Sequence, residues 1–202
     1  MSSGRPLIAV SPAEDYLRCT EAVDFEEPAV IGLASGLGGG TDMDVLRRAF
    51  ELVRDRFPHS RDVGGDEVPF SASDVVRAGH GLCYAKSHLL AALLRYHGIP
   101  AGFCYQRLND DGTFLLHCYN AAYVDGRWLR VDARGNNGSV HVEFDPDADM
   151  QAIKTDEALG EKDYPVVFSR PDPGVVRALR TYRSLSQMVL PCDLSCPLNG
   201  DN

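Results

Sequence analysis

The sequence predicts one domain of the α+β class, in which a helical N-terminal half packs on an antiparallel β-sheet meander. Apolar residues recur at helical spacing over residues 45–57 and again over residues 85–96. From Ala101 onward the apolar pattern changes to a period of two, which is typical of strands. The dipeptide Asp125-Gly126 is a strong two-residue hairpin signal, so the strands around it are expected to be consecutive and antiparallel.

The composition is that of an ordinary globular chain. Charged residues make up 24% and hydrophobic residues 44% of the 202 residues, which is enough for a substantial core. We expect a single domain over residues 1–190, with its core at about 42–169. Residues 191–202 contain Pro, Asn and Gly and are expected to form a flexible C-terminal tail.

The charge and the lack of long apolar runs restrict the partners that we expect. A net charge of −9 argues against a nucleic-acid-binding protein, which usually carries a basic face. No apolar run approaches the roughly 18 residues that span a bilayer, and no leader pattern follows Met1. We therefore expect a soluble, cytoplasmic protein without nucleic-acid or membrane partners, and the sequence leaves its oligomeric state open.

Helix boundaries follow from capping residues, prolines and glycines. Thr41 is expected to cap a helix, with Asp44 three residues later as a variant of the capping box. Pro173 suits the first turn of the last helix, and Ser71 or Ser73 caps a short one. The expected helices cover residues 28–37, 42–57, 71–78, 83–96 and 174–188.

The strands are expected where the period of two is clearest. A turn at Asn109–Gly112 and the turn at Asp125-Gly126 separate the three strands of the meander. The expected strands cover residues 7–10, 101–108, 113–124, 127–133, 139–144 and 164–168.

Cys83 occupies the most informative position in the chain. Gly79 and Gly81 interrupt regular structure before it, whereas Gly98 and Pro100 supply the stop signal after the helix. Cys83 is thus expected on the first turn of a largely buried helix, where free backbone N–H groups and the helix dipole favour an anion. There a thiol pKa falls from roughly 8.5 to about 3.5–7.5, particularly beside a histidine. The alternative is a small core residue, as unpaired cysteines often are.

The hairpin register places a histidine near a carboxylate. If Asp125 and Gly126 form the turn, Tyr119 lies opposite Asp132, and His117 becomes a diagonal neighbour of Asp132 on the same face. If Leu108 lies opposite Thr113 in the first hairpin, that face also carries Cys104 and Gln106. A helix that packs on this face would bring the thiol, the imidazole and the carboxylate together.

These three side chains suit nucleophilic catalysis. A thiolate attacks an acyl carbon, and an imidazole holds the thiolate in an ion pair and later protonates the leaving amine. A carboxylate orients the imidazole and stabilises its charged form. The alternative is structural: His117 as a satisfied core histidine and Asp132 as a strand-end residue that bonds the following turn.

Two stretches, residues 79–103 and 116–136, resemble the transglutaminase-like superfamily, and more narrowly its bacterial single-domain members. The resemblance covers roughly residues 42–169 and rests on three separated motifs in the same order. These are Gly81-Leu82-Cys83, then Gly98-Ile99-Pro100 after the helix, then His117 on a strand followed by Trp128 and Asp132 in a Trp-x-x-x-Asp pattern.

The resemblance implies a papain-like fold and a Cys83–His117–Asp132 triad that performs acyl transfer without a metal or an organic cofactor. It implies no single substrate, because the superfamily contains cross-linkers, proteases, amidases and inactive members. In the animal transglutaminases a tryptophan upstream of the cysteine stabilises the oxyanion, whereas the single tryptophan here is Trp128.

Another donor must then serve the oxyanion, and the sequence offers several candidates for the site. Gln106 and His59 are the candidates for the oxyanion donor. His80, next to the Gly-x-Cys motif, and Tyr119, next to His117 on the same strand face, are candidates for lining the site.

We expect a cysteine-dependent acyl transfer or hydrolysis on a peptide, protein or small amide, with a protease or amidase favoured over a cross-linker. One alternative is a non-catalytic module that binds a peptide or another partner with the same fold. Another is a redox-sensing thiol protein in which Cys104 or Cys118 resolves an oxidised Cys83. Cys192 and Cys196 have no second Cys or His pair nearby, so a zinc site is not favoured there.

Overall fold

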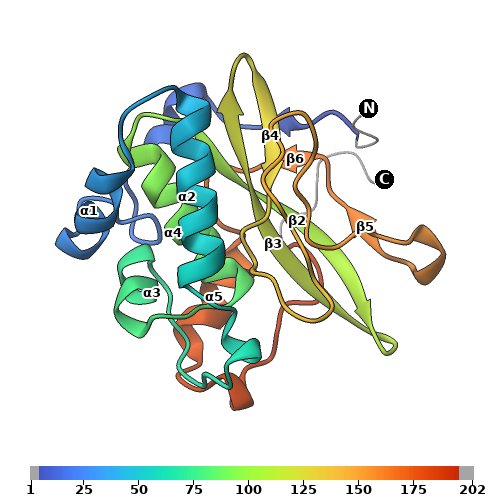
Figure 1. The fold of residues 1–202 in the computed structure, drawn as a ribbon. Coiled ribbons are helices and arrows are strands. Elements are labelled where there is room, and N and C mark those ends of the chain that lie inside the picture. The colour runs from blue at the N-terminus through green and yellow to red at the C-terminus, as the bar shows by residue number, and fades with distance from the viewer. Residues whose placement is uncertain (1–4, 196–202) are drawn as a thin grey trace.

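A computed structural model describes residues 5–195, and Figure 1 shows helices on one side of the molecule and an antiparallel sheet on the other. The α-helices are α1 (Pro28–Ala34), α2 (Asp42–Arg56), α3 (Ala72–Ala78), α4 (Cys83–Tyr96) and α5 (Pro173–Thr181). The strands are β1 (Ile8–Ala9), β2 (Ala101–Asp110), β3 (Thr113–Val124), β4 (Arg127–Val131), β5 (Lys162–Asp163) and β6 (Val166–Val167). This arrangement confirms the predicted α+β class. Within the described residues no helix has the length and apolar character needed to cross a membrane.

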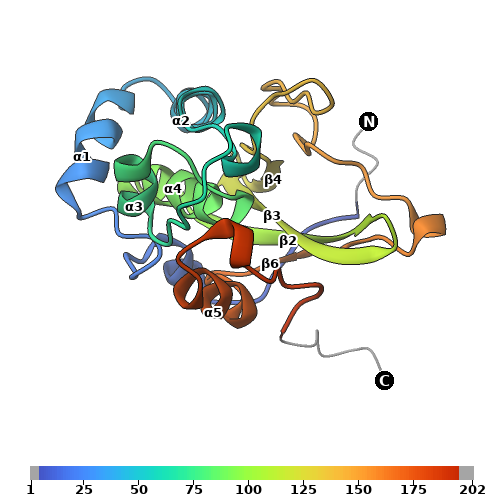
Figure 2. The same cartoon turned by 90° about the horizontal axis from the view of Figure 1, so that it is seen from below.

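Helix α4 forms the centre of the fold, and its bounds are those predicted. It contacts α1, α2 and α3 on one side and β2 and β3 on the other, and Figure 2 shows it between these layers. Thirteen of its fourteen residues are buried, so the helix is enclosed almost all round. The capping box predicted for α2 is present, with Thr41 paired to Asp44. Of the two caps predicted for α3, Ser71 is the one used, and it forms a capping box with Asp74.

The main sheet has the order β4-β3-β2-β5, and its second hairpin has the predicted register, with Val124 opposite Arg127. The predicted register of the first hairpin is wrong by two residues, because Asp110 rather than Leu108 begins the turn opposite Thr113. The turn contains only Asp111-Gly112, both with positive φ, as a tight two-residue hairpin turn requires. A shift of two residues keeps every side chain on its predicted face.

Two predicted elements differ from the structure in residues 139–168. Residues 139–144 form no strand, because the side chain of Asn137 bonds the backbone N–H groups of Ser139 and Val140 and removes them from any ladder. The predicted strand 164–168 is shortened to β6, Val166–Val167, which pairs in parallel with β1. Strand β5 lies before the predicted strand, at Lys162–Asp163, and pairs with β2.

The C-terminal region also departs from prediction. Helix α5 ends at Thr181 instead of continuing to residue 188, and a short 3₁₀ turn follows at Leu185–Gln187. Of the expected tail, residues 191–195 are hydrogen-bonded to the body of the domain; one such bond joins the N–H of Leu116 to the carbonyl of Pro191 at 2.7 Å. The remainder, which includes Cys196, lies outside the described residues.

One buried group in α4 makes the stability of the fold depend on pH. His88 lies between the rings of Phe70 and Phe103, with Nδ1 2.7 Å from the carbonyl oxygen of Phe70. Burial lowers the pKa of His88 to about 4. As the pH falls from about 6.5 to about 4, the unfolded chain therefore binds a proton that the folded chain does not, and folding becomes less favourable.

We expect His88→Gln to reduce this loss, because a glutamine stays neutral and can still donate to the Phe70 carbonyl. Urea unfolding at pH 7 and pH 4 should show a smaller drop in the free energy of unfolding for the variant, by up to about 3 kcal/mol. The exposed His141→Gln is the matched control and should behave like the parent. Equal losses in His88→Gln and the parent would contradict the assignment.

Candidate active site

The local structure around Cys83 fixes its thiol at the start of α4. Gly79 ends α3 in the left-handed conformation, with φ of 74°. The following residues run beside the segment after α2: Ser60 N–H donates to the Gly81 carbonyl at 3.0 Å, and Gly81 N–H donates to the Pro58 carbonyl at 3.3 Å. Cys83 is the first residue of α4, so its backbone N–H has no acceptor inside the helix.

His117 and Asp132 meet as the register predicted. Nε2 of His117 lies 2.7 Å from Oδ2 of Asp132, and both side chains are buried. The backbone N–H groups of Arg134 and Ala152 also donate to the Asp132 side chain, at 3.0 and 3.1 Å. The carboxylate is therefore held from three directions and in turn orients the imidazole.

The thiol reaches His117 around the edge of β3. Helix α4 packs on the face of the sheet opposite His117, where Asn120 donates to the Ser87 carbonyl at 3.0 Å. Strand β4 ends opposite Asn120, which leaves β3 without a strand neighbour on that side at residues 116–118. The first turn of α4 lines this open edge, where the Tyr84 hydroxyl donates to the Leu116 carbonyl.

The electrostatics favour an ion pair between the two groups. Burial raises the pKa of Cys83, but the hydrogen bond and charge of His117, followed by those of His59, lower it to about 6. Burial lowers the pKa of His117, but the charge and hydrogen bond of Asp132 and the contact with Cys83 raise it to about 10. At neutral pH the arrangement favours a thiolate beside an imidazolium.

His59 is the second imidazole in contact with the thiol. It is buried, it forms a parallel bridge with Gly81, and its Nδ1 has no hydrogen-bond partner. His80 lies beside this segment, with Nδ1 2.9 Å from the Ser60 hydroxyl. The structure thus brings His59 to the thiol and uses His80 to hold the segment that carries His59.

Gln106 and Tyr119 lie on the His117 face but have other partners. Gln106 is opposite His117, and its Nε2 donates to the Ile153 carbonyl at 3.1 Å, so one of its two amide N–H groups is in use. The ring of Tyr119 stacks beside that of His117, and its hydroxyl donates to Asp163 at 2.8 Å. The single tryptophan packs against Tyr16 and Tyr123 instead of the thiol.

Two groups that support the site were not predicted from the sequence. Lys86, one turn after Cys83, is buried, and its ammonium donates to the carbonyls of Val53 and Phe57 at the end of α2. Burial lowers the pKa of Lys86 to about 7. Arg134 and Asp62 form a two-bond ion pair at 2.7 and 3.1 Å, which joins the loop of Asp132 to the loop after His59. Of these groups, the sequence signals only Lys86, as a lysine within an apolar helical run.

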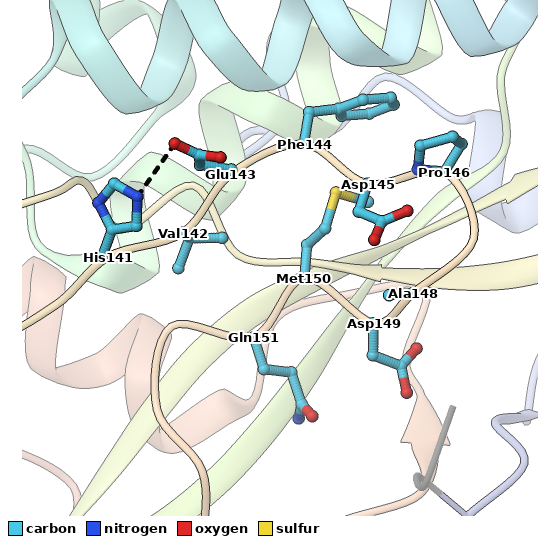
Figure 3. Close-up of a pocket in the computed structure, with 10 residues that line it drawn as sticks. All are labelled: His141, Val142, Glu143, Phe144, Asp145, Pro146, Ala148, Asp149, Met150 and Gln151. Atoms are coloured by element: carbon cyan, nitrogen blue, oxygen red, sulfur yellow. Dashed lines mark hydrogen bonds and ion pairs between the residues drawn. The ribbon is translucent and has the colours of Figure 1, made fainter. Parts of the chain in front are cut away.

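The loop after Asp132 surrounds a separate pocket. Figure 3 shows this pocket, whose volume is about 400 Å³ and whose lining runs from His141 to Gln151. The same loop supplies the Met150 carbonyl to the N–H of Asp132 at 2.8 Å. The thiol and His117 do not line it. Among residues 5–195 no group of three or more His, Cys, Asp or Glu side chains could hold a metal ion.

Comparisons with known proteins identify the family and support the fold class. The family model of the transglutaminase-like superfamily matches residues 32–133. None of the curated proteins compared with the chain matches it significantly. A solved structure named "Putative Cysteine Protease from Cytophaga hutchinsonii" is 20% identical, with a TM-score of 0.50 over 60% of this chain and 42% of its own. At that identity the likeness is one of fold, and it supports the predicted papain-like class.

Two further solved structures have lower TM-scores. A "putative protease" from Parabacteroides distasonis is 14% identical, with a TM-score of 0.41 over 59% of this chain and 25% of its own. A structure described as a TGase is 15% identical, with a TM-score of 0.44 over 73% of this chain and 43% of its own. The chain thus spans about two fifths of the length of the protein from C. hutchinsonii.

The geometry predicts that Cys83 reacts as a thiolate at mildly acidic pH. With limiting iodoacetamide, its labelling should rise with a midpoint near pH 6, because His117 and His59 stabilise the thiolate. Burial raises the pKa values of Cys104 and Cys118, so these thiols should stay unlabelled. Peptide mapping by mass spectrometry measures each site. Labelling of the exposed Cys192 at pH 6 with Cys83 untouched would contradict the prediction.

A second prediction concerns the carboxylate. Asp132→Asn keeps the shape but removes the charge that stabilises the His117 imidazolium, so the alkylation midpoint of Cys83 should move to higher pH. Turnover should fall by about 10²–10³, less than in serine triads because a thiolate–imidazolium pair can form without the carboxylate. Asp125→Asn is the control, since Asn-Gly suits the same turn. Parental alkylation in Asp132→Asn would argue against this role of the carboxylate.

Proposed function

The chain belongs to the transglutaminase-like superfamily, and from this premise we propose that it is a cysteine hydrolase acting on the acyl group of an amide or peptide bond. Cys83 is the nucleophile in this proposal, His117 the acid and base, and Asp132 the group that orients and charges His117. The family and the fold support a cysteine enzyme in general terms; the reaction, its acceptor and the roles of these residues are our proposal.

The proposal rests on the groups that surround the Cys83 thiol. The thiol lies at the start of a buried helix, against an imidazole whose other nitrogen is 2.7 Å from a buried carboxylate. A structural cysteine needs none of these partners, and burial alone would raise its pKa, as at Cys104. At Cys83 the two histidines reverse that effect.

The first half of the reaction forms a thioester. The Cys83 thiolate attacks the acyl carbon, and the carbonyl π electrons move to oxygen and make a tetrahedral oxyanion. The imidazolium of His117 gives its proton to the amide nitrogen as the carbon–nitrogen bond breaks, and the amine leaves. His117 is then neutral, with its hydrogen bond to Asp132 preserved.

The second half releases the acid. Neutral His117 takes a proton from water as the water oxygen attacks the thioester, and the carbon–sulfur bond breaks to give the acid and the thiolate. A primary amine in place of water would give a new amide. We favour water because none of the described contacts identifies an amine-binding group at the thiol.

His59 and the backbone N–H of Cys83 are the proposed oxyanion donors. In the tetrahedral intermediate the oxyanion and the sulfur are bonded to the same carbon, so a donor that reaches the sulfur can also reach the oxygen. His59 contacts the thiol. Gln106 is less suited, because its amide is held by the Ile153 carbonyl and it is not among the side chains that hydrogen-bond the thiol.

Trapping the thioester tests the proposal. Incubation with a library of peptide amides, quenched in acid, should add one acyl group to Cys83 that hydroxylamine removes, as intact mass and peptide mapping would show. Cys83→Ala should form no adduct and should keep its thermal midpoint within a few degrees, because the substitution removes one small side chain at a helix start. Cys19→Ala, at a partly exposed thiol, should acylate like the parent. Acylation that persists in Cys83→Ala would overturn the proposal.

A further inference from the structure

We propose that the open edge of β3 beside His117 binds an extended peptide with an acidic side chain, and that residues 184–195, here named the strap, fill this edge in the free protein. The inference rests on the proposed function, because the edge adjoins the thiol. The inference narrows the proposed substrate class from any amide to an extended peptide. It also implies that the strap must move before a substrate enters.

The thiol is covered in the structure. Cys83 exposes 9% of its surface, His59 7% and His117 4%. An acyl carbon must come within bonding distance of the sulfur and needs room for the groups on either side of it. Some part of the chain must therefore move before a peptide can reach Cys83.

The strap is bonded to the segment that follows His59 and to β3 next to His117. On the side of His59, Ser184 pairs with Glu67, the Ser184 hydroxyl donates to Asp66 at 2.6 Å, and the Ser186 N–H donates to Asp66 at 2.8 Å. On the side of His117, the carbonyl of Pro191 accepts from the Leu116 N–H at 2.7 Å. In Figure 1 the strap belongs to the red C-terminal segment that leaves the region of α5 and passes to the sheet.

The strap is a surface segment that can leave without opening the core. Four of its apolar side chains are only partly buried against the core cluster that contains Cys83 and Tyr84; these are Leu185, Met188, Leu190 and Leu194. Val189, between them, is 69% exposed. The end of the strap is bonded as well, because the N–H and the hydroxyl of Ser195 donate to Asp172 at 2.8–3.0 Å. A segment held by hydrogen bonds and by side chains that are at most half-buried belongs to the less stable part of a fold and opens locally.

The backbone under the strap is a strand edge suited to a peptide. Because β4 ends opposite Asn120, no strand among residues 5–195 pairs with β3 on this side at Leu116. The Leu116 carbonyl accepts from Tyr84 within the core, but its N–H is bonded only through Pro191 of the strap. When the strap leaves, this N–H becomes a free donor next to His117, and an extended chain supplies the acceptor in the way that edge strands bind peptides.

Asp193 shows which side chain the edge selects. Its Oδ2 lies 3.1 Å from the guanidinium of Arg107, and its Oδ1 accepts from the Tyr164 hydroxyl. Arg107 is the β2 residue directly opposite Leu116, and its other nitrogen is held by the Gly160 carbonyl at 2.7 Å. Arg107 and Tyr164 lie outside the strap and remain in place when it leaves. An acidic residue two positions after the one that pairs with Leu116 can therefore take the place of Asp193.

Asp193→Ala in the full chain tests whether the strap covers the thiol. Loss of the ion pair and of the Tyr164 bond should raise the open population, and with it the alkylation rate of Cys83 by iodoacetamide, about tenfold. Ser184→Ala, which loosens the opposite end, should act in the same direction. Asp147→Ala, at an exposed aspartate outside the strap, is the charge-matched control and should alkylate at the parental rate.

A peptide added in trans tests the substrate class. A synthetic peptide with the sequence of residues 188–195, with serine in place of Cys192, should slow Cys83 alkylation in Asp193→Ala and restore a rate near the parental one. The same peptide with asparagine in place of Asp193 should need a several-fold higher concentration. In the double variant Asp193→Ala, Arg107→Gln the two peptides should compete equally, because the guanidinium that distinguishes them is gone.

The outcomes separate this inference from the proposed function. Parental alkylation rates in both Asp193→Ala and Ser184→Ala would overturn the role of the strap, and equal competition by the two peptides with Arg107 intact would overturn the acidic preference. If the peptides compete as expected but no thioester forms with any peptide amide, the binding edge stands and the enzymatic proposal fails.

Discussion

The burial of α4 is the constraint on which the rest of the structure depends. Three α-helices and two strands enclose it, so its polar side chains cannot reach water and must find partners inside the domain. Lys86 bonds the carbonyls at the end of α2, His88 bonds the Phe70 carbonyl, and Arg95 bonds the Ala101 carbonyl at 2.7 and 3.0 Å. These bonds join the helix to its neighbours and fix its rotation, and with it the direction of the Cys83 thiol.

The early end of β4 gives this helix access to His117. A strand that continued beyond Val131 would cover residues 116–118 of β3 and separate the thiol from the imidazole. The chain instead leaves the sheet at Asp132, whose backbone N–H turns to the Met150 carbonyl at 2.8 Å. The same departure brings Asp132 to His117, so the end of one strand both opens the edge and supplies the carboxylate.

Local signals explain how much of this could be predicted from the sequence. The bounds of α4 follow from the glycines on either side of it, and the second hairpin follows from Asp125-Gly126. The register error in the first hairpin was harmless, because a shift of two residues keeps the faces. The meeting of Cys83 with His117 depends on the open edge of β3, and the position of His59 depends on pairing between residues 58–60 and 81. Neither of these two arrangements produces a periodic pattern in the sequence. The sequence also gives no signal for the position of the strap, because backbone and polar groups hold its two ends.

Closure of the site strengthens the ion pair inside it, and the net charge of the chain affects how an acidic peptide approaches. Away from water, the attraction between the Cys83 thiolate and the His117 imidazolium is less screened, so a cover that excludes solvent strengthens the pair. The net charge of −9 repels an acidic peptide at long range, but salt limits that repulsion to about 8 Å at physiological ionic strength. At short range the acidic side chain can pair with the Arg107 guanidinium, which the strap's own Asp193 occupies in the free protein. An acidic peptide therefore gains the ion pair with Arg107 only after Asp193 has left it, so the preference for an acidic side chain depends on removal of the strap.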